Sequence, residues 1–208
     1  MALSKLTLSV LISSKQIEFA AEREDIVALM RPMPLLAVDA AQNWAPEARP
    51  VEKKSVDQAA SCAIYVGLFG CIYSEPTILE YRSASGNRYR EILIYIKDCP
   101  KREGPLAEFL KEVMDPKTGR TVVRYSDWSK VRKRFREHLW EATGRMVQHL
   151  LRLADPPAAM GEDGSILERR WVVEKKALLN LGLPSNPGEA RELARFFENE
   201  RLKPRGGL

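Results

Sequence analysis

The stretch YVGLFGCIYSEPTILEY, residues 65–81, places a glutamate, Glu80, shortly after an apolar run that contains two glycines. Residues 63–70 predict a buried strand and residues 77–86 a helix, because Pro76 suits a first helical turn and Ser74 can cap it. Helical side chains point back toward the N-terminus, so the Glu80 carboxylate should face the crevice beyond the strand ends, where open α/β sheets bind ligands. Such a carboxylate can act on a bound ligand, although a glutamate on a solvated helix surface fits the same residues equally well.

Other residues of the same crevice follow from the strand ends. Ser13 and Ser14 close the first predicted strand, and residues 67–73 span the end of the strand before the glutamate. Gly67 and Gly70 would let a ligand approach the backbone closely, because glycine has no Cβ. We therefore expect the two serines and residues 67–73 to line the ligand crevice.

Several catalytic classes lack their characteristic residues. His138 and His149 fall eleven residues apart in one predicted helix, and no cluster of cysteines or carboxylates accompanies them. The chain has no GxxxxGK[ST] phosphate loop, no GxGxxG fingerprint and no nucleophile elbow. The sequence therefore does not predict a metal site, an ATPase, a dehydrogenase or a serine hydrolase.

The three cysteines, Cys62, Cys71 and Cys99, adjoin predicted strands and have no metal-like spacing. We expect them to be buried free thiols. The N-terminal residues alternate like a strand and not like a signal peptide, and no apolar run reaches about 18 residues. These features together predict a cytoplasmic protein without a membrane span.

The remaining pattern in the first two thirds of the chain predicts an α/β fold. Five apolar, β-rich runs alternate with helical segments, which is typical of a mostly parallel sheet with helices on both faces, flavodoxin-like in outline. The predicted strands are residues 6–13, 35–39, 63–70, 91–98 and 121–126. The predicted helices between them are residues 16–30, 55–61, 77–86 and 106–114, with Ser55 as a cap after a loop over residues 42–54.

From Trp128 to Ala154 the pattern becomes that of one long helix. Apolar residues recur every three to four positions and leave the basic side chains of residues 130–136 on the outward faces. A charged run around an apolar stripe is usually a solvated surface.

A C-terminal helical extension follows this helix. Residues 155–165 predict a linker, and two further helices are expected over residues 166–181 and 187–202, the second with Asn186 as its cap. We therefore predict an α/β domain over residues 1–140 and a helical extension over residues 141–208.

Composition permits one domain of ordinary size with an appendage. The chain has 208 residues, of which 45% are hydrophobic and 29% charged. Its formal charge is +5, but 28 acidic residues are interspersed with 33 basic ones. That mixture does not predict a nucleic-acid binder, whose basic residues gather on one face.

Several motifs, in this order, resemble the domain-of-unknown-function family 4062, a TIR-like module of bacterial signalling and defence proteins. They are LSVLISSK…FAAERE, SCAIYVGLFGCIYS…TILEYRSA, ILIYIKD and REGPLAEFLKEV…YSDW, and they span residues 5 to about 140. The resemblance implies a flavodoxin-like, TIR-type fold that is related also to nucleoside deoxyribosyltransferases.

The resemblance also implies an activity. In TIR domains a glutamate on the helix after the third strand acts on an N-glycosidic bond, and that position corresponds to Glu80 here. The family's Ser/Thr and Cys pattern before the glutamate is kept in part, at Ser74 and Thr77, but no cysteine lies between Thr77 and Glu80. The resemblance implies that NAD or a related nucleotide is the substrate and not a cofactor, that Phe69 or Tyr73 packs on a base, and that the Ser13–Ser14 amides meet a phosphate.

Two alternatives remain open at this stage. A non-catalytic TIR-like module would assemble through residues 5–140 and bind a partner protein through residues 155–208. A deoxyribosyltransferase-like enzyme would instead act on nucleosides or nucleotides. We expect a homo-oligomer or a protein partner bound through the C-terminal helices, and neither a membrane nor a nucleic acid as a partner.

Overall fold

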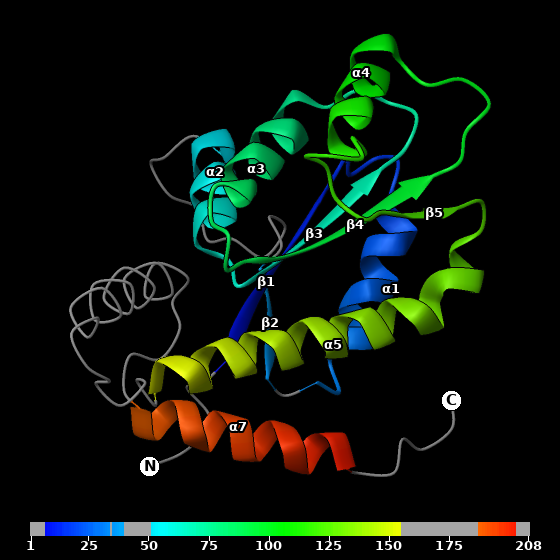
Figure 1. Cartoon of the computed structure of the whole chain (residues 1–208). Coiled ribbons are helices and arrows are strands. Elements are labelled where there is room, and N and C mark those ends of the chain that lie inside the picture. The colour runs from blue at the N-terminus through cyan, green and yellow to red at the C-terminus, as the bar shows by residue number, and fades with distance from the viewer. Residues whose placement is uncertain (1–6, 34, 40–50, 155–186, 203–208) are drawn as a thin grey trace, which may run out of the picture.

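A five-stranded parallel sheet lies at the centre of the structure (Figure 1). The structure is a computed structural model that describes residues 7–33, 35–39, 51–154 and 187–202. The strands are β1 (Leu8–Ser14), β2 (Leu36–Asp39), β3 (Ile64–Phe69), β4 (Glu91–Lys97) and β5 (Val123–Tyr125). They lie in the order β2-β1-β3-β4-β5, and every neighbouring pair is parallel. This arrangement confirms the predicted flavodoxin-like α/β fold.

Helices cover both faces of this sheet. They are α1 (Ala20–Met30), α2 (Val51–Ser61), α3 (Glu75–Ser85), α4 (Gly104–Val113), α5 (Trp128–Ala154) and α7 (Pro187–Leu202). Figure 1 shows α2, α3 and α4 on one face and α1 and α5 on the other, with α7 beyond α5. The two hydrophobic clusters follow the same division, since one contains residues of α1, α5 and α7 and the other contains residues of α2, α3 and α4.

Alternation along β1 divides its side chains between these two faces. Val10 and Ile12 belong to the cluster on the α1 and α5 side, and Leu11 belongs to the cluster on the α3 side. Successive side chains of a strand point to opposite faces, so Ser13 lies on the α3 side and Ser14 on the α1 side. This division decides which of the two serines can reach Glu80.

Arg90, just before β4, connects the C-terminal ends of α2 and α3 to the sheet through hydrogen bonds. Its guanidinium is buried and donates to the carbonyls of Cys62 at 2.7 Å and Ala60 at 2.5 Å, near the end of α2. It also donates to the carbonyl of Ala84 in the last turn of α3. The last carbonyls of a helix have no partner within the helix, so a cation at this point satisfies them and interacts favourably with both helix dipoles.

The region before β3 corrects two predictions. α2 begins at Val51, so the predicted loop is wrong for residues 51–54, and its residues 42–50 lie outside the described part of the chain. Ser55 is not a cap but a buried residue in the middle of α2. The mixed charges suggested a loop, yet Ser55 and Ala59, four residues apart, form the buried face of an amphipathic helix.

The start of α3 differs slightly from its prediction. The helix begins at Glu75, two residues earlier than expected, and Ser74 occupies the N-cap position without a capping hydrogen bond from its side chain. The Ser74 hydroxyl instead accepts a hydrogen bond from the Thr77 hydroxyl at 2.9 Å.

The long helix α5 packs α7 against the core. Val131, Phe135 and Leu139 are buried, and Lys130 and Lys133 are exposed, which confirms the expected solvated basic surface. The Phe197 ring of α7 lies 5.5 Å from the Trp140 ring of α5.

The apolar face of α7 is therefore covered by α5 of the same chain. The predicted boundary between residues 140 and 141 lies inside α5, while the predicted linker, the helix over residues 166–181 and the Asn186 cap lie outside the described residues. None of the described helices combines the length and the apolar character that crossing a membrane requires.

Candidate functional site

Glu80 reaches the carboxyl end of β1. The Ser13 hydroxyl, on the α3 side of the sheet, donates a hydrogen bond to Glu80 Oε2. Ser13 is the penultimate residue of β1, and only 1% of its surface is exposed. The strand order reverses between β1 and β3, and open α/β sheets bind ligands at such a switch point. The carboxylate therefore lies where this fold class places its ligands.

Two further groups surround the Glu80 carboxylate. The Ser55 hydroxyl of α2 hydrogen-bonds it, and the Arg23 guanidinium of α1 acts on it through its charge. Burial raises the pKa of Glu80 above its ordinary value, because an ionised carboxylate is poorly solvated there, and the two serine hydroxyls and Arg23 offset part of this increase. Glu80 is thus a partly desolvated acid held by hydroxyl groups.

Arg23 connects this cluster to the end of β1. Its Nη1 atom donates to the Ile12 carbonyl at 2.8 Å and to the Ser14 hydroxyl at 3.1 Å. Burial lowers the pKa of Arg23, and the Glu80 charge opposes that change. Ser14 therefore anchors the arginine on the α1 side and is not brought to Glu80.

Gly67 leaves the space that this arrangement requires. It is the register partner of Ser13 on β3, so its missing side chain would point to the same face as the Ser13 side chain. A Cβ at Gly67 would lie 2.9 Å from ring atoms of both Tyr65 and Phe69, which is closer than real Cβ contacts.

The hydroxyl of Tyr65 extends the same polar network. It hydrogen-bonds Ser13 and donates to the Thr77 carbonyl at 3.5 Å. Burial raises the pKa of Tyr65 well above its ordinary value, so this hydroxyl keeps its proton. Thr77 contributes to the site through its backbone carbonyl, while its own hydroxyl bonds Ser74.

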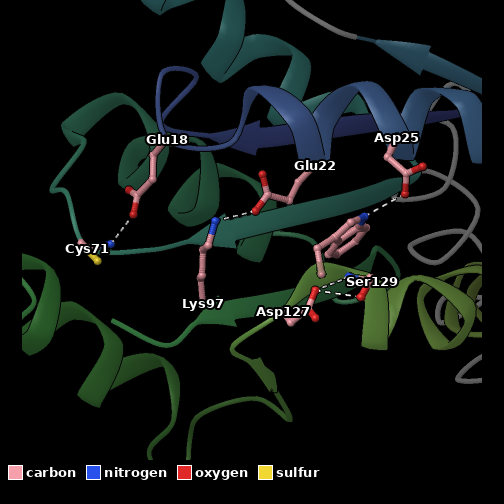
Figure 2. Close-up of polar contacts among 8 residues, drawn as sticks. Glu18, Glu22, Asp25, Cys71, Lys97, Asp127 and Ser129 are labelled. Atoms are coloured by element: carbon pink, nitrogen blue, oxygen red, sulfur yellow. Dashed lines mark hydrogen bonds and ion pairs between the residues drawn. The ribbon is translucent and has the colours of Figure 1, made fainter. Parts of the chain in front are cut away.

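Carboxylates accept hydrogen bonds from backbone amides of the loop between β3 and α3, and Figure 2 shows the one between Glu18 and Cys71. The Glu18 side chain accepts hydrogen bonds from the Cys71 amide at 2.6 Å and the Ile72 amide at 3.2 Å. Glu103 accepts one from the Tyr73 amide at 2.7 Å. A Cβ at Gly70 would lie 2.0 Å from Glu18 Oε1, so the glycine allows this close approach.

Acidic residues in α1 and just before it make further contacts with other elements. Figure 2 shows Glu18, Glu22 and Asp25, which are four and three residues apart, each directed at a different element. Glu22 pairs with Lys97 at the end of β4 at 2.7 Å, and Asp25 accepts from Trp128 Nε1 of α5 at 2.8 Å. The β1–α1 connection is therefore joined to the loop after β3, to β4 and to α5.

Among the described residues, a small hollow lies beside the loops that follow β1 and β3. Its volume is about 10 Å³, and it is lined among others by Lys15, Phe69, Gly70 and Thr77. That volume holds about one water molecule, whereas pockets for small ligands usually measure roughly 300–1,000 Å³. Tyr73 is half-buried and packs against the hydrophobic cluster on the α3 side. This hollow by itself is therefore too small for a nucleotide.

The structure groups the predicted residues differently from the sequence. It brings Ser13 and Glu80 together, with the backbone of Thr77 linked to them through Tyr65. Phe69 and Gly70 line the small hollow.

Three residues of the polar cluster were not predicted. Tyr65 could have been found from the alternation of residues 65, 67 and 69 on one strand face. Arg23 and Ser55 carry no sequence feature that links them to residue 80.

No family model, curated protein or solved structure matches this chain. Within the described ranges, no three histidine, cysteine or acidic side chains are grouped closely enough to hold a metal ion. The class that the structure defines is a flavodoxin-like α/β protein with a carboxyl group at the switch point of its sheet.

Proposed function

We propose that this protein is an N-glycosidase that cleaves NAD or a related nucleotide, with Glu80 as the catalytic residue. The observation that carries the proposal is the hydrogen bond between Ser13 and the Glu80 carboxylate at the β1–β3 switch point. A carboxylate at that position, partly removed from water, interacts strongly with a positive charge that develops nearby.

The reaction suits a single carboxylate. When the bond between C1′ of the ribose and the nicotinamide nitrogen breaks, the bonding electrons leave with nicotinamide, which becomes neutral, and the ribose acquires oxocarbenium character. Glu80 stabilises this positive charge, hydrogen-bonds a ribose hydroxyl or forms a transient ester, and water completes the hydrolysis. No general acid is needed, because the leaving group already carries a positive charge in NAD.

Regulation of this enzyme would act on the loop between β3 and α3, which leads to the helix that carries Glu80. Glu18 and Glu103 together accept hydrogen bonds from three successive amides of the loop after β3. We propose that self-assembly or a partner protein releases these hydrogen bonds, as expected of a cytoplasmic effector in bacterial defence or signalling, since an unregulated NAD hydrolase would be toxic.

The test is release of nicotinamide from NAD by the purified protein, measured over a range of protein concentrations and with candidate activators. Glu80→Gln keeps the size of the side chain and should reduce release by about 100-fold or more. Glu75→Gln is the matched control on the same helix, because Glu75 is exposed and should be dispensable. Release that survives Glu80→Gln would contradict the catalytic assignment.

A non-catalytic interaction module is the second candidate. It is favoured by a hollow of about 520 Å³ between α5 and α7, lined among others by Trp140, Gly144 and Phe197. Absence of nicotinamide release in every oligomeric state, together with concentration-dependent assembly in sedimentation experiments, would favour this function over hydrolysis.

A further inference from the structure

Cys71 and Cys99 lie at neighbouring strand ends on the rim of the candidate site. Cys71 is the second residue after β3 and Cys99 the second after β4, and these strands pair in register up to Phe69 and Ile96. The two thiols are close enough for each to affect the ionisation of the other. Both are free and half-buried, whereas Cys62 is buried, so the prediction of three buried thiols is correct only for Cys62.

The loops that carry the two thiols are held together by other groups. Arg102 donates to the Gly70 and Lys97 carbonyls, both at 2.7 Å. The Glu103 amide donates to the Cys71 carbonyl at 3.0 Å. These contacts keep the two loops next to each other, which a disulfide between them requires.

We propose that Cys71 and Cys99 are a site of oxidative modification, where a disulfide forms across the loops that follow β3 and β4. The oxidant is a disulfide of the glutathione class. One protein thiolate attacks glutathione disulfide, which forms a mixed disulfide and releases one glutathione. The other protein thiolate then attacks the protein sulfur of that mixed disulfide and releases the second glutathione. Two protein thiols thus lose two electrons and two protons, and glutathione disulfide takes up both.

The surroundings of Cys71 favour the reduced form when no oxidant is present. The neighbouring Cys99 thiol and burial raise the pKa of Cys71 to about 11, and the Glu18 charge acts in the same direction. Since the thiolate is the nucleophile, this cysteine reacts slowly near neutral pH.

A disulfide here would restrain the loop that leads from β3 into α3. That loop contains the amides bound by Glu18 and Glu103, so the bond would reinforce the arrangement in which these carboxylates hold the loop. A cross-link between residues 71 and 99 also restricts the unfolded chain, and we expect it to raise the Tm by about 5–10 °C. This inference does not depend on whether Glu80 is catalytic.

The experiment incubates the full chain with glutathione disulfide and identifies its disulfides by mass spectrometry of peptides digested without reduction. We expect a Cys71–Cys99 linkage, unmodified Cys62, and amide hydrogen exchange over residues 71–74 that slows by about tenfold or more. Cys62 serves as the internal control because it is buried in the same chain.

Two variants separate a specific pair from general thiol reactivity. Cys71→Ser and Cys99→Ser should each leave one glutathione adduct on the remaining cysteine and show neither the Tm increase nor the slower exchange. Stable glutathione adducts on both cysteines of the unmodified sequence, or equal labelling of all three cysteines, would overturn the proposal. The linkage is read directly in the unmodified sequence, so a variant that fails to fold leaves the test intact.

Discussion

Removing the Ser13 hydroxyl should destabilise the protein more when residue 80 is glutamate than when it is glutamine. A hydrogen bond to a charged group contributes about 1.5–3 kcal/mol to stability, and one between neutral groups about 0.5–1.5 kcal/mol. Ser13 is buried, so water does not take the place of its hydroxyl when Ser13→Ala removes it. The double-mutant cycle of Ser13→Ala and Glu80→Gln should therefore give a coupling free energy of about 1 kcal/mol or more where Glu80 is ionised. The lost contact between Ser13 and Tyr65 is common to both backgrounds and cancels in the cycle.

The same coupling should depend on pH in a defined direction. Because the pKa of Glu80 in the folded protein is raised above its ordinary value of 4.5, the folded state binds more protons than the unfolded state between these two pKa values. The stability of the unmodified sequence should therefore fall relative to Glu80→Gln as the pH rises through that interval, and the difference should level off above the raised pKa. At acid pH the Glu80 carboxyl is protonated and is as neutral as the glutamine that replaces it. The coupling between Ser13 and residue 80 should therefore approach zero.

Urea denaturation with linear extrapolation measures these free energies, at about pH 4 and about pH 8. Ser9→Ala is the matched control, because Ser9 lies on the same strand, and its hydroxyl accepts a hydrogen bond from the Ala63 amide at 3.1 Å. Its cycle with Glu80→Gln should give no coupling at either pH. A Ser13 coupling below about 0.3 kcal/mol at the higher pH, or one that persists undiminished in acid, would refute the assignment of this hydrogen bond to an ionised carboxylate.

Three further changes test the packing around the site. Gly67→Ala should reduce the free energy of unfolding, measured by urea denaturation, by about 1–3 kcal/mol, because its Cβ would meet the Tyr65 and Phe69 rings. Gly104→Ala is the control: its Cβ would have open space around it, so it should cause no loss. Arg90→Ala should reduce the free energy of unfolding by about 3 kcal/mol or more, since it leaves carbonyls at the ends of α2 and α3 unpaired. The control Arg82→Ala removes an exposed arginine and should change the same free energy by less than about 1 kcal/mol. Glu18→Gln should speed hydrogen exchange of the Cys71 and Ile72 amides by about tenfold, because these amides donate to the Glu18 carboxylate. Glu24→Gln, at an exposed residue, is the control. Equal exchange rates in the two variants would show that Glu18 does not hold the loop.

The sequence by itself determined the sheet and most of the helices. β3 and β4 were predicted to within a residue at each end, because parallel strands covered on both faces are continuous apolar runs that differ plainly from their neighbours. α5 was predicted from Trp128 to Ala154 because its apolar residues recur with helical period. These patterns are local, and each is recorded in consecutive residues.

The tertiary structure alone decided the surroundings of Glu80. Periodicity directed the carboxylate toward the strand ends, but Ser13, Ser55 and Arg23 come from β1, α2 and α1, which are distant in the sequence. Alternation along β1 sends Ser13 to the α3 side and Ser14 to the α1 side, yet which side faces which helix depends on how the helices pack. The contact of Glu18 with the loop after β3 has the same origin, because Glu18 meets the Cys71 amide, 53 residues away in the sequence, only when β1 and β3 lie next to each other. Hydrogen bonds between distant segments leave no periodic pattern, so only the folded chain specifies them.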